Sequence, residues 1–236
     1  MAKHVLITGF EPFGGGTVNP SELVARSLEG RLIAGRLVVT RILPVETRNV
    51  RERLERALDE ERPDIAICMG LASGRNAIAL ERVAVNVLDF DRADNVGVVR
   101  KHEAIARGGP DARISSLPFD IIIASWNESG VPGYVSNSAG TYICNQALYE
   151  LLGATQAAAS PILAGFVHLP YLPAQAIDAG PETNPSMPLE LMKRAMELLI
   201  ETVVPWVENR TPERGAAARP PGSKMWIPRG VKEVER

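Results

Sequence analysis

The chain has 236 residues, of which 45% are hydrophobic and 23% charged, and its formal net charge is −2 at pH 7. This balance is typical of a globular domain and argues against a nucleic-acid binder. Two cysteines exclude a disulfide scaffold, and without an apolar run of about 18 residues we expect no membrane span. The first apolar run is too short for a signal peptide. We therefore expect a soluble cytoplasmic protein with free thiols.

Strand-like and helix-like segments alternate along the chain. Strands are predicted over 4–10, 37–45, 64–70 and 162–169, with an extended run over 77–88 and an apolar run, grouped with the strands, over 119–126. Helices are predicted from 19–22 to near Gly30, from Val50 to before Pro63, from Cys144 to Leu152 and over 189–203. Such alternation indicates an α/β fold, a mainly parallel sheet with both faces covered, in one domain over 1–208.

The segment from Asn209 to Arg236 differs from the rest of the chain. It holds seven Lys or Arg against three Glu, together with four prolines. This composition predicts an irregular basic tail over 209–236. The apolar triplet 225–227 is expected to dock on its own chain or on a sister subunit, or to serve as a partner motif.

The glycine-rich turn after the first strand matches no phosphate-binding fingerprint. Gly9 and Gly14 have the spacing of a P-loop, but Gly15 and Gly16 stand where Lys and a hydroxyl residue are needed. The three histidines and two cysteines lack the spacing of zinc ligands. We therefore expect no metal and no nucleotide cofactor.

Cys144 is the first candidate for a reactive group. It directly precedes a helical pattern, so its thiol would face the positive end of the helix dipole and free backbone N–H groups. That setting can lower a thiol pKa from about 8.5 to roughly 3.5–7.5, and the N–H groups can bind an oxyanion. The alternative is a buried structural cysteine, which is the interpretation we favour for Cys68 in the middle of a strand.

His168 is the candidate base. It lies at the carboxyl end of a strand-like run, where sites form in open α/β sheets. The alternative is a satisfied core or edge histidine. Of the other two histidines, His102 is expected in a solvated loop and His4 is expected to be structural.

Glu81 is the candidate third residue. In the extended run it shares one face with the residues at 83, 85 and 87, a face that is predicted to be buried. A carboxylate on such a face needs a partner, either an arginine such as Arg82 or Arg92 or a histidine. An internal ion pair with arginine is the alternative to a catalytic role. With a thiol and an imidazole, the carboxylate would complete a nucleophile–base–orienter set.

Four groups of residues carry a family resemblance. They are the segments 9–14 with 19–21, 69–70 with 80–82 and Asn86, 140–145, and 165–170. In this order and spacing the chain resembles pyroglutamyl-peptidase type I, also called pyrrolidone-carboxylate peptidase. The resemblance implies a cytosolic cysteine exopeptidase that removes N-terminal L-pyroglutamyl residues from peptides. It also implies a single three-layer α/β/α domain, usually a homotetramer, without a metal or organic cofactor and without nucleic-acid or membrane partners.

The resemblance assigns roles to individual positions. The nucleophile falls on Cys144, the base on His168 and the third catalytic residue on Glu81. The pocket for the pyrrolidone ring falls on Phe10, Phe13, Tyr142 and Ile143. For the two phenylalanines, the alternative is packing in the hydrophobic core. Asn19 is expected to contact the ring carbonyl, to cap the next helix, or to do both.

Two departures from the family pattern bear on the site. Leu71 follows Gly70 where the family usually has Gln. The change lowers substrate affinity unless the residue at this position contacts the substrate through its backbone. In the segment 89–95 the arginine comes one residue later, as Arg92, and Ala93 replaces a proline. Arg92 is therefore only a possible support for the oxyanion.

Three rival functions stay open at this level. The first is a hydrolase with altered substrate choice, the second a binding protein with slow turnover, and the third an interaction module built on the tail. The reactivity of the Cys144 thiol separates the second from an enzyme, because a structural thiol alkylates slowly near neutral pH.

Overall fold

The computed structural model describes residues 3–158, 161–180, 182 and 184–209. The main sheet has seven strands in the order β10-β5-β11-β4-β1-β3-β2. Their bounds are β1 His4–Phe10, β2 Leu32–Ile33, β3 Arg36–Leu43, β4 Ile65–Leu71, β5 Ile78–Glu81, β10 Gly133–Ser136 and β11 Leu163–Leu169. The central strands β3, β1, β4 and β11 are parallel, whereas β5 runs antiparallel to β11 and β2 antiparallel to β3.

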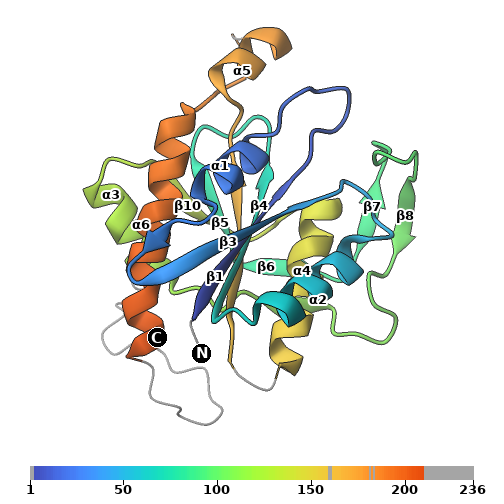
Figure 1. Cartoon of the computed structure of the whole chain (residues 1–236). Helices are drawn as coiled ribbons and strands as arrows, with labels where there is room; N and C mark the ends of the chain where they lie inside the picture. Colours follow the sequence, from blue (N-terminus) through green and yellow to red (C-terminus); the bar gives the residue numbers. More distant parts are fainter. Residues whose placement is uncertain (1–2, 159–160, 181, 183, 210–236) are drawn as a thin grey trace, which may run out of the picture.

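Helices cover both faces of this twisted sheet (Figure 1). The helices are α1 Pro20–Leu28, α2 Val50–Glu61, α3 Phe119–Glu128, α4 Ile143–Ala157, α5 Pro173–Ala179 and α6 Leu189–Glu208. One hydrophobic core lies between the sheet and α1, α3 and α6, and a second lies between the sheet and α2 and α4. The chain therefore forms the expected three-layer α/β/α sandwich around a mainly parallel sheet.

Four short strands form two small ladders outside the main sheet. Strand β6 Val83–Val85 pairs with β9 Ala112–Ile114, and β7 Leu88–Phe90 pairs with β8 Arg100–Glu103. Asn145, in the first turn of α4, exchanges hydrogen bonds with both backbone groups of Val85. The β6–β9 ladder is therefore fixed to the end of the sheet at which α4 begins.

The alternation of side chains along the strands determines which face carries the polar groups. In β11, Leu163, Val167 and Leu169 belong to the core with α6, whereas Ala164 and Phe166 belong to the core with α4. Period two therefore places the side chain of His168, two residues after Phe166, on the α4 side.

The structure corrects two sequence predictions. The run 119–126 forms helix α3, because its apolar residues Ile122 and Trp126 recur at helical spacing and pack on α6. The run 77–88 is not one strand, because the chain leaves the main sheet after Glu81 and continues in the β6–β9 ladder. The predicted buried face is wrong for this reason: Val87 is 37% exposed, although Glu81 itself is fully buried.

The other predicted strands are confirmed within two residues at their ends, whereas α4 and α6 continue five residues beyond their predicted ends, to Ala157 and Glu208. Helix α5 and the strands β2, β8, β9 and β10 were not predicted. Among the described residues, no helix combines the length and hydropathy that a bilayer crossing needs. Residues 210–236, with the 225–227 triplet, lie outside the described residues, so the domain boundary and the tail stay predictions.

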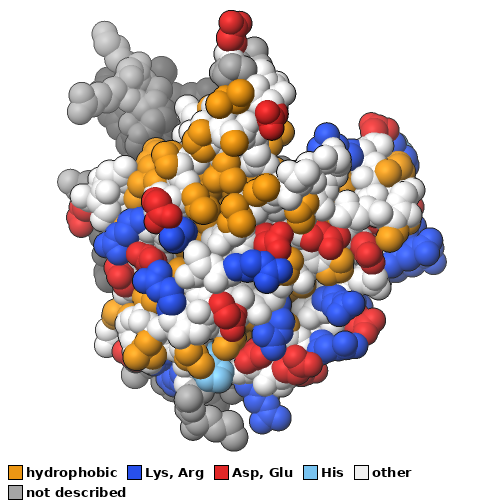
Figure 2. All heavy atoms as spheres, turned by 45° about the horizontal axis from the view of Figure 1, so that its top comes forward, with side chains coloured by type: hydrophobic (Ala, Val, Ile, Leu, Met, Phe, Trp, Pro, Cys, Tyr) orange, Lys and Arg blue, Asp and Glu red, His pale blue; other side chains and the backbone are white. Residues whose placement is uncertain are grey.

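The surface is uneven in polarity. Figure 2 shows hydrophobic side chains gathered at the end of the molecule where α5 lies, while charged side chains dominate the face beside it. Val18 before α1 and Ile177 in α5 are among the exposed large hydrophobic residues, with Ile177 65% exposed.

Gly133 on the edge strand provides a test of the packing between β10 and α3. A Cβ at this position would lie 2.3 Å from Cε3 of Trp126, a fully buried ring that donates a hydrogen bond to the carbonyl oxygen of Ala195 in α6. We expect Gly133→Ala to lower the free energy of unfolding by about 1–3 kcal/mol, as overpacking does. Tyr134→Phe on the same strand is the control, expected within about 0.5 kcal/mol of wild type in urea unfolding. Equal stability of all three proteins would contradict the described contact.

Candidate active site

A hydrogen bond between Glu81 and His168 lies at the centre of the site. Glu81 is the last residue of β5 and His168 is the penultimate residue of β11, and both are buried. In the antiparallel register Glu81 is opposite Phe166 and His168 is opposite Ala79, so the two side chains are diagonal neighbours on the α4 side. Nδ1 of His168 lies 2.7 Å from Oε1 of Glu81.

The pairing fixes the tautomer of the imidazole. Burial works to raise the pKa of Glu81, but the hydrogen bonds that its carboxylate accepts, first of all from His168 and also from Arg75, outweigh burial and hold the pKa below its ordinary value. An ionised carboxylate can only accept, so Nδ1 of His168 carries the hydrogen and Nε2 keeps its lone pair. Burial lowers the pKa of His168 despite the opposing effect of Glu81, so the ring is a neutral base at pH 7.

Arg75 is a member of the site that sequence reasoning missed. Its Nη1 lies 2.7 Å from the same Oε1 of Glu81, and its side chain is 22% exposed. Sequence reasoning offered Arg82, Arg92 or a histidine as the partner of Glu81. The histidine is confirmed, whereas Arg82 instead donates to Asn137. The signal was absent because Arg75 lies in the loop between β4 and β5, where no period indicates which way a side chain points.

Cys144 lies at the second position of α4, above the sheet face that carries His168. A Cβ built on Gly70 would lie 2.8 Å from Cys144 Sγ and 2.9 Å from Cζ of Phe166. Gly70 is the register partner of His168 on the adjacent parallel strand. The sulfur and the imidazole thus lie over neighbouring strands, on the same face and at the same level of the sheet. The sulfur fits there because Gly70 has no side chain.

The start of α4 supplies unused backbone donors beside the sulfur. The first bond within the helix runs from the amide of Gln146 to the carbonyl of Tyr142. The amides of Ile143, Cys144 and Asn145 precede it and have no carbonyl partner one turn back. Their N–H groups are aligned with the helix axis, which favours negative charge near Sγ.

The thiol is nevertheless not acidic in this structure. Burial raises the pKa of Cys144 to about 12, and the negative charge of Glu81 adds to the effect, while Arg75 opposes it. The sequence indicates that a helix terminus can lower the thiol pKa, but here burial outweighs that effect. The sulfur must lose its proton to a base before it can react.

A small apolar cavity opens beside Cys144. Its volume is about 300 Å³, including the open mouth, and its lining residues are Phe10, Phe13, Asn19, Val45, Leu71, Tyr142, Ile143 and Cys144. The four predicted pocket residues thus lie together, with Asn19 and Leu71 in the same wall. The rings of Phe13 and Tyr142 are 6.2 Å apart.

Asn19 has a structural role in this wall. Its Oδ1 accepts hydrogen bonds from the amide and hydroxyl of Ser21 and so caps α1, and its Nδ2 donates to the carbonyl oxygen of Glu11. The second hydrogen of Nδ2 is not needed for these bonds. The helix cap predicted for Asn19 is confirmed, and one amide hydrogen stays available to a ligand.

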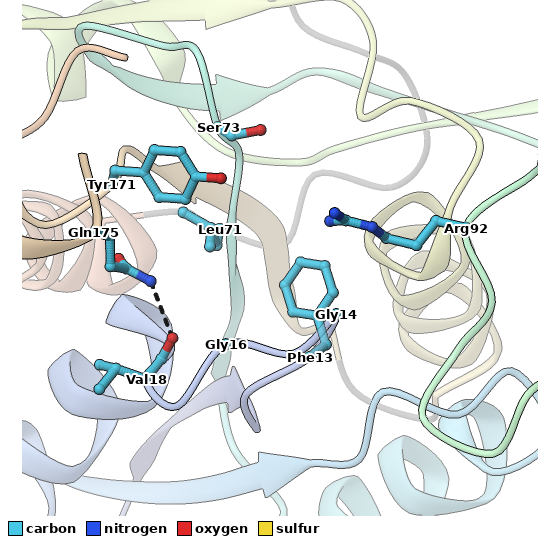
Figure 3. Close-up of a pocket in the computed structure, with 9 residues that line it drawn as sticks. All are labelled: Phe13, Gly14, Gly16, Val18, Leu71, Ser73, Arg92, Tyr171 and Gln175. Carbon is cyan, nitrogen blue, oxygen red and sulfur yellow. Dashed lines mark hydrogen bonds between the residues drawn. The ribbon is translucent and has the colours of Figure 1, made fainter. Parts of the chain in front are cut away.

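Arg92 lies at the edge of the cavity and not beside Glu81. Its guanidinium carbon is 5.7 Å from the centre of the Phe13 ring. Figure 3 shows Arg92 and Tyr171 approaching from opposite sides of a second cavity, with Leu71 between them and Phe13 below. Leu71 and Phe13 line both this second cavity and the first.

The remaining candidates lie away from the site. His102 is in β8 and its side chain is 85% exposed, so it is solvated as expected, although it is in a strand and lies 3.1 Å from Asp89. His4 lies 4.0 Å from Glu61, and Cys68 is buried in the core with α4. In the described part of the chain, no group of three acidic, His or Cys side chains is arranged to hold a metal ion.

Comparison with known proteins gives a consistent result. The family model for pyroglutamyl peptidase matches residues 3–205. A pyrrolidone-carboxylate peptidase of Pyrococcus furiosus is 44% identical over 202 residues, which are 85% of this chain and 97% of the relative. One of Chromobacterium violaceum is 49% identical over 177 residues, 74% of this chain and 81% of the relative. A solved structure of the P. furiosus enzyme aligns with a TM-score of 0.84, covering 86% of this chain and 99% of its own.

The pKa of Cys144 predicts how its alkylation depends on pH. Because burial keeps the sulfur protonated, the rate with iodoacetamide should rise continuously from pH 6 to 9 without a plateau. Mass spectrometry of the labelled peptide measures that rate, and Cys144→Ala, which retains Cys68, gives the background. A plateau below pH 8 would instead indicate a preformed thiolate.

Proposed function

This chain belongs to the pyroglutamyl peptidase family, and we propose that Cys144, His168 and Glu81 carry out its reaction, the hydrolytic removal of an N-terminal pyroglutamyl residue from peptides. The observation that supports the assignment best is the 2.7 Å bond from His168 to Glu81, on the sheet face over which Cys144 lies. It leaves one imidazole nitrogen free to act as a base towards the thiol.

In the acylation step, Nε2 of His168 takes the thiol proton while Sγ of Cys144 attacks the pyroglutamyl carbonyl carbon. The oxygen becomes an oxyanion, which the amides at the start of α4 are placed to stabilise. The carbon–nitrogen bond then breaks, and the imidazolium returns its proton to the leaving amine. A thioester remains on Cys144, and the shortened peptide departs.

In the deacylation step, His168 takes a proton from water, which attacks the thioester carbon. The second oxyanion collapses, the carbon–sulfur bond breaks, and the proton passes back to sulfur as pyroglutamate leaves. Glu81 stays ionised and stabilises the imidazolium in both steps. Arg75 is a positioning residue, because it holds the carboxylate and does not reach the reacting atoms.

The apolar cavity fits the substrate's chemistry. A five-membered lactam has no charge, so the walls made by Phe10, Phe13 and Tyr142 hold it without leaving an ion unpaired. The remaining amide hydrogen of Asn19 is available to the lactam carbonyl. A prolyl residue would bring a charged ring nitrogen into the same walls, which costs free energy because nothing there pairs it.

We extend this proposal to a homotetramer in the cytoplasm. A homotetramer follows from the family resemblance, and the exposed side chain of Ile177 in α5 agrees with a subunit contact. The two free thiols agree with a reducing, cytoplasmic setting.

Catalysis is tested with a pyroglutamyl chromogenic amide. Cys144→Ala should abolish turnover. Glu81→Gln should lower kcat on the order of 10²- to 10⁴-fold, because no negative charge then stabilises the imidazolium. The acid limb of the kcat/KM profile should also move to lower pH in Glu81→Gln, since Glu81 raises the pKa of His168.

The matched control is His102→Asn, in which an exposed histidine is replaced and turnover should be unchanged. A prolyl amide should not be cleaved by any of these proteins. Full activity in Cys144→Ala, or no turnover by the intact reduced protein, would refute the proposed mechanism.

The assembly is tested by sedimentation of the full chain and of a chain that ends at Glu208, the last residue of α6. We expect a tetramer for the full chain. If the tail docks on a sister subunit, the shortened chain should dissociate at concentrations where the full chain does not; an unchanged size would exclude that role.

A further inference from the structure

We propose that the second cavity receives the residue that follows pyroglutamate, and that Arg92 makes the enzyme prefer a carboxylate on that residue. The inference rests on the proposed function, because it locates the leaving part of the same substrate.

Three cavities form a continuous row that starts at Cys144. The ring cavity of about 300 Å³ shares Phe13 and Leu71 with a second cavity of about 500 Å³, both volumes including open space. The second shares Gly14, Tyr171 and other residues with a third, of about 980 Å³, between the 14–18 loop and α5. A peptide whose first residue fills the ring cavity therefore meets the second cavity with its next residue.

The second cavity carries an unpaired positive charge. Among the described residues that line it, Arg92 is the only charged one; the others are Phe13, Gly14, Gly16, Val18, Leu71, Ser73, Tyr171 and Gln175. The neighbouring Asp91 forms an ion pair with Lys101, at 2.7 Å, and so does not neutralise Arg92. No carboxylate of the described chain pairs with the Arg92 guanidinium, which packs on Phe13.

The loop that carries Arg92 is held in place. Asp94 is 5% exposed and accepts hydrogen bonds from the amides of Thr47, Val96 and Val98. Asn95 donates to Glu11 Oε1 at 2.7 Å and to the carbonyl oxygen of Pro12. These bonds fix the loop against the segment that bears Phe13, so the position of Arg92 at the cavity does not depend on substrate.

The guanidinium is also directed by what surrounds it. Gly14 has φ +62°, and a Cβ there would lie 3.2 Å from the Arg92 guanidinium carbon, so the glycine leaves space for it. Figure 3 shows the charged end of Arg92 pointing across the cavity towards the hydroxyl of Tyr171, with the hydroxyl of Ser73 on the same side as that ring. A carboxylate between these groups would have one cation and two hydroxyl donors around it.

The test compares pyroglutamyl-glutamyl-alaninamide with pyroglutamyl-glutaminyl-alaninamide, which differ only in the charge of the second residue. Release of pyroglutamate is followed by chromatography. We expect kcat/KM to be about two- to five-fold higher for the glutamyl peptide, the range of a solvent-exposed ion pair. The preference should vanish at about 1 M salt, where the Debye length is near 3 Å.

Variants assign the preference to Arg92. In Arg92→Gln the ratio of the two kcat/KM values should fall to about one, and in Arg92→Lys part of it should remain. Arg56→Gln, in which an exposed arginine on α2 is removed, is the matched control and should keep the wild-type ratio. The dipeptide pyroglutamyl-glutamine, with its free terminal carboxylate, distinguishes a main-chain from a side-chain carboxylate.

The outcomes are distinguishable. No cleavage of either peptide would overturn the proposed function itself. Cleavage of both with a wild-type ratio near one would overturn this inference alone. An equal loss for both peptides in Arg92→Gln would show that Arg92 supports the oxyanion or the ring cavity and not the second residue, and would also overturn it.

Discussion

The buried carboxylate of Glu81 is the constraint on which the rest of the site depends. A charge without exposed surface is tolerated only if partners surround it, and here His168 and Arg75 both direct a nitrogen at the same oxygen. The carboxylate can sit there because β5 runs against β11, which places Glu81 and His168 as diagonal neighbours on one face. The direction of β5 relative to β11 thus determines the orientation of the His168 ring.

The same face accounts for the positions of Cys144, the proposed nucleophile, and of the apolar cavity. Helix α4 begins above Gly70, so the sulfur meets a backbone and not a side chain, and its first turn presents unused amides to the same place. The cavity walls come from the end of β1, the end of β4 and the start of α4. The site therefore depends on strand ends that the hydrophobic core holds in register and on the loop between β1 and α1, which carries Phe13 and Asn19.

Residue types and positions in the sequence predicted the fold class, most of the elements and the set Cys144, His168 and Glu81, which the structure brings together on one sheet face. The errors have physical causes. The alternation of side chains along a strand was continued past Glu81, although the chain leaves the main sheet there for another ladder. The effect of the helix dipole on Cys144 was considered without burial, which raises the pKa of the thiol. Arg75 was missed because it lies in a loop, where no regular alternation of residues indicates which way a side chain points. Contacts between segments distant in the chain, such as Asn95 with Glu11, leave no local signal either.

The high pKa of the Cys144 thiol has a consequence for the life of the protein. Peroxides oxidise thiolates, and a sulfur that stays protonated at rest presents little of the form they attack. A thiol that yields its proton only to a neighbouring neutral imidazole would be a strong nucleophile during turnover and resistant to oxidation at rest. The rate of oxidative inactivation would then depend on how often the Cys144 thiol is deprotonated while no substrate is bound.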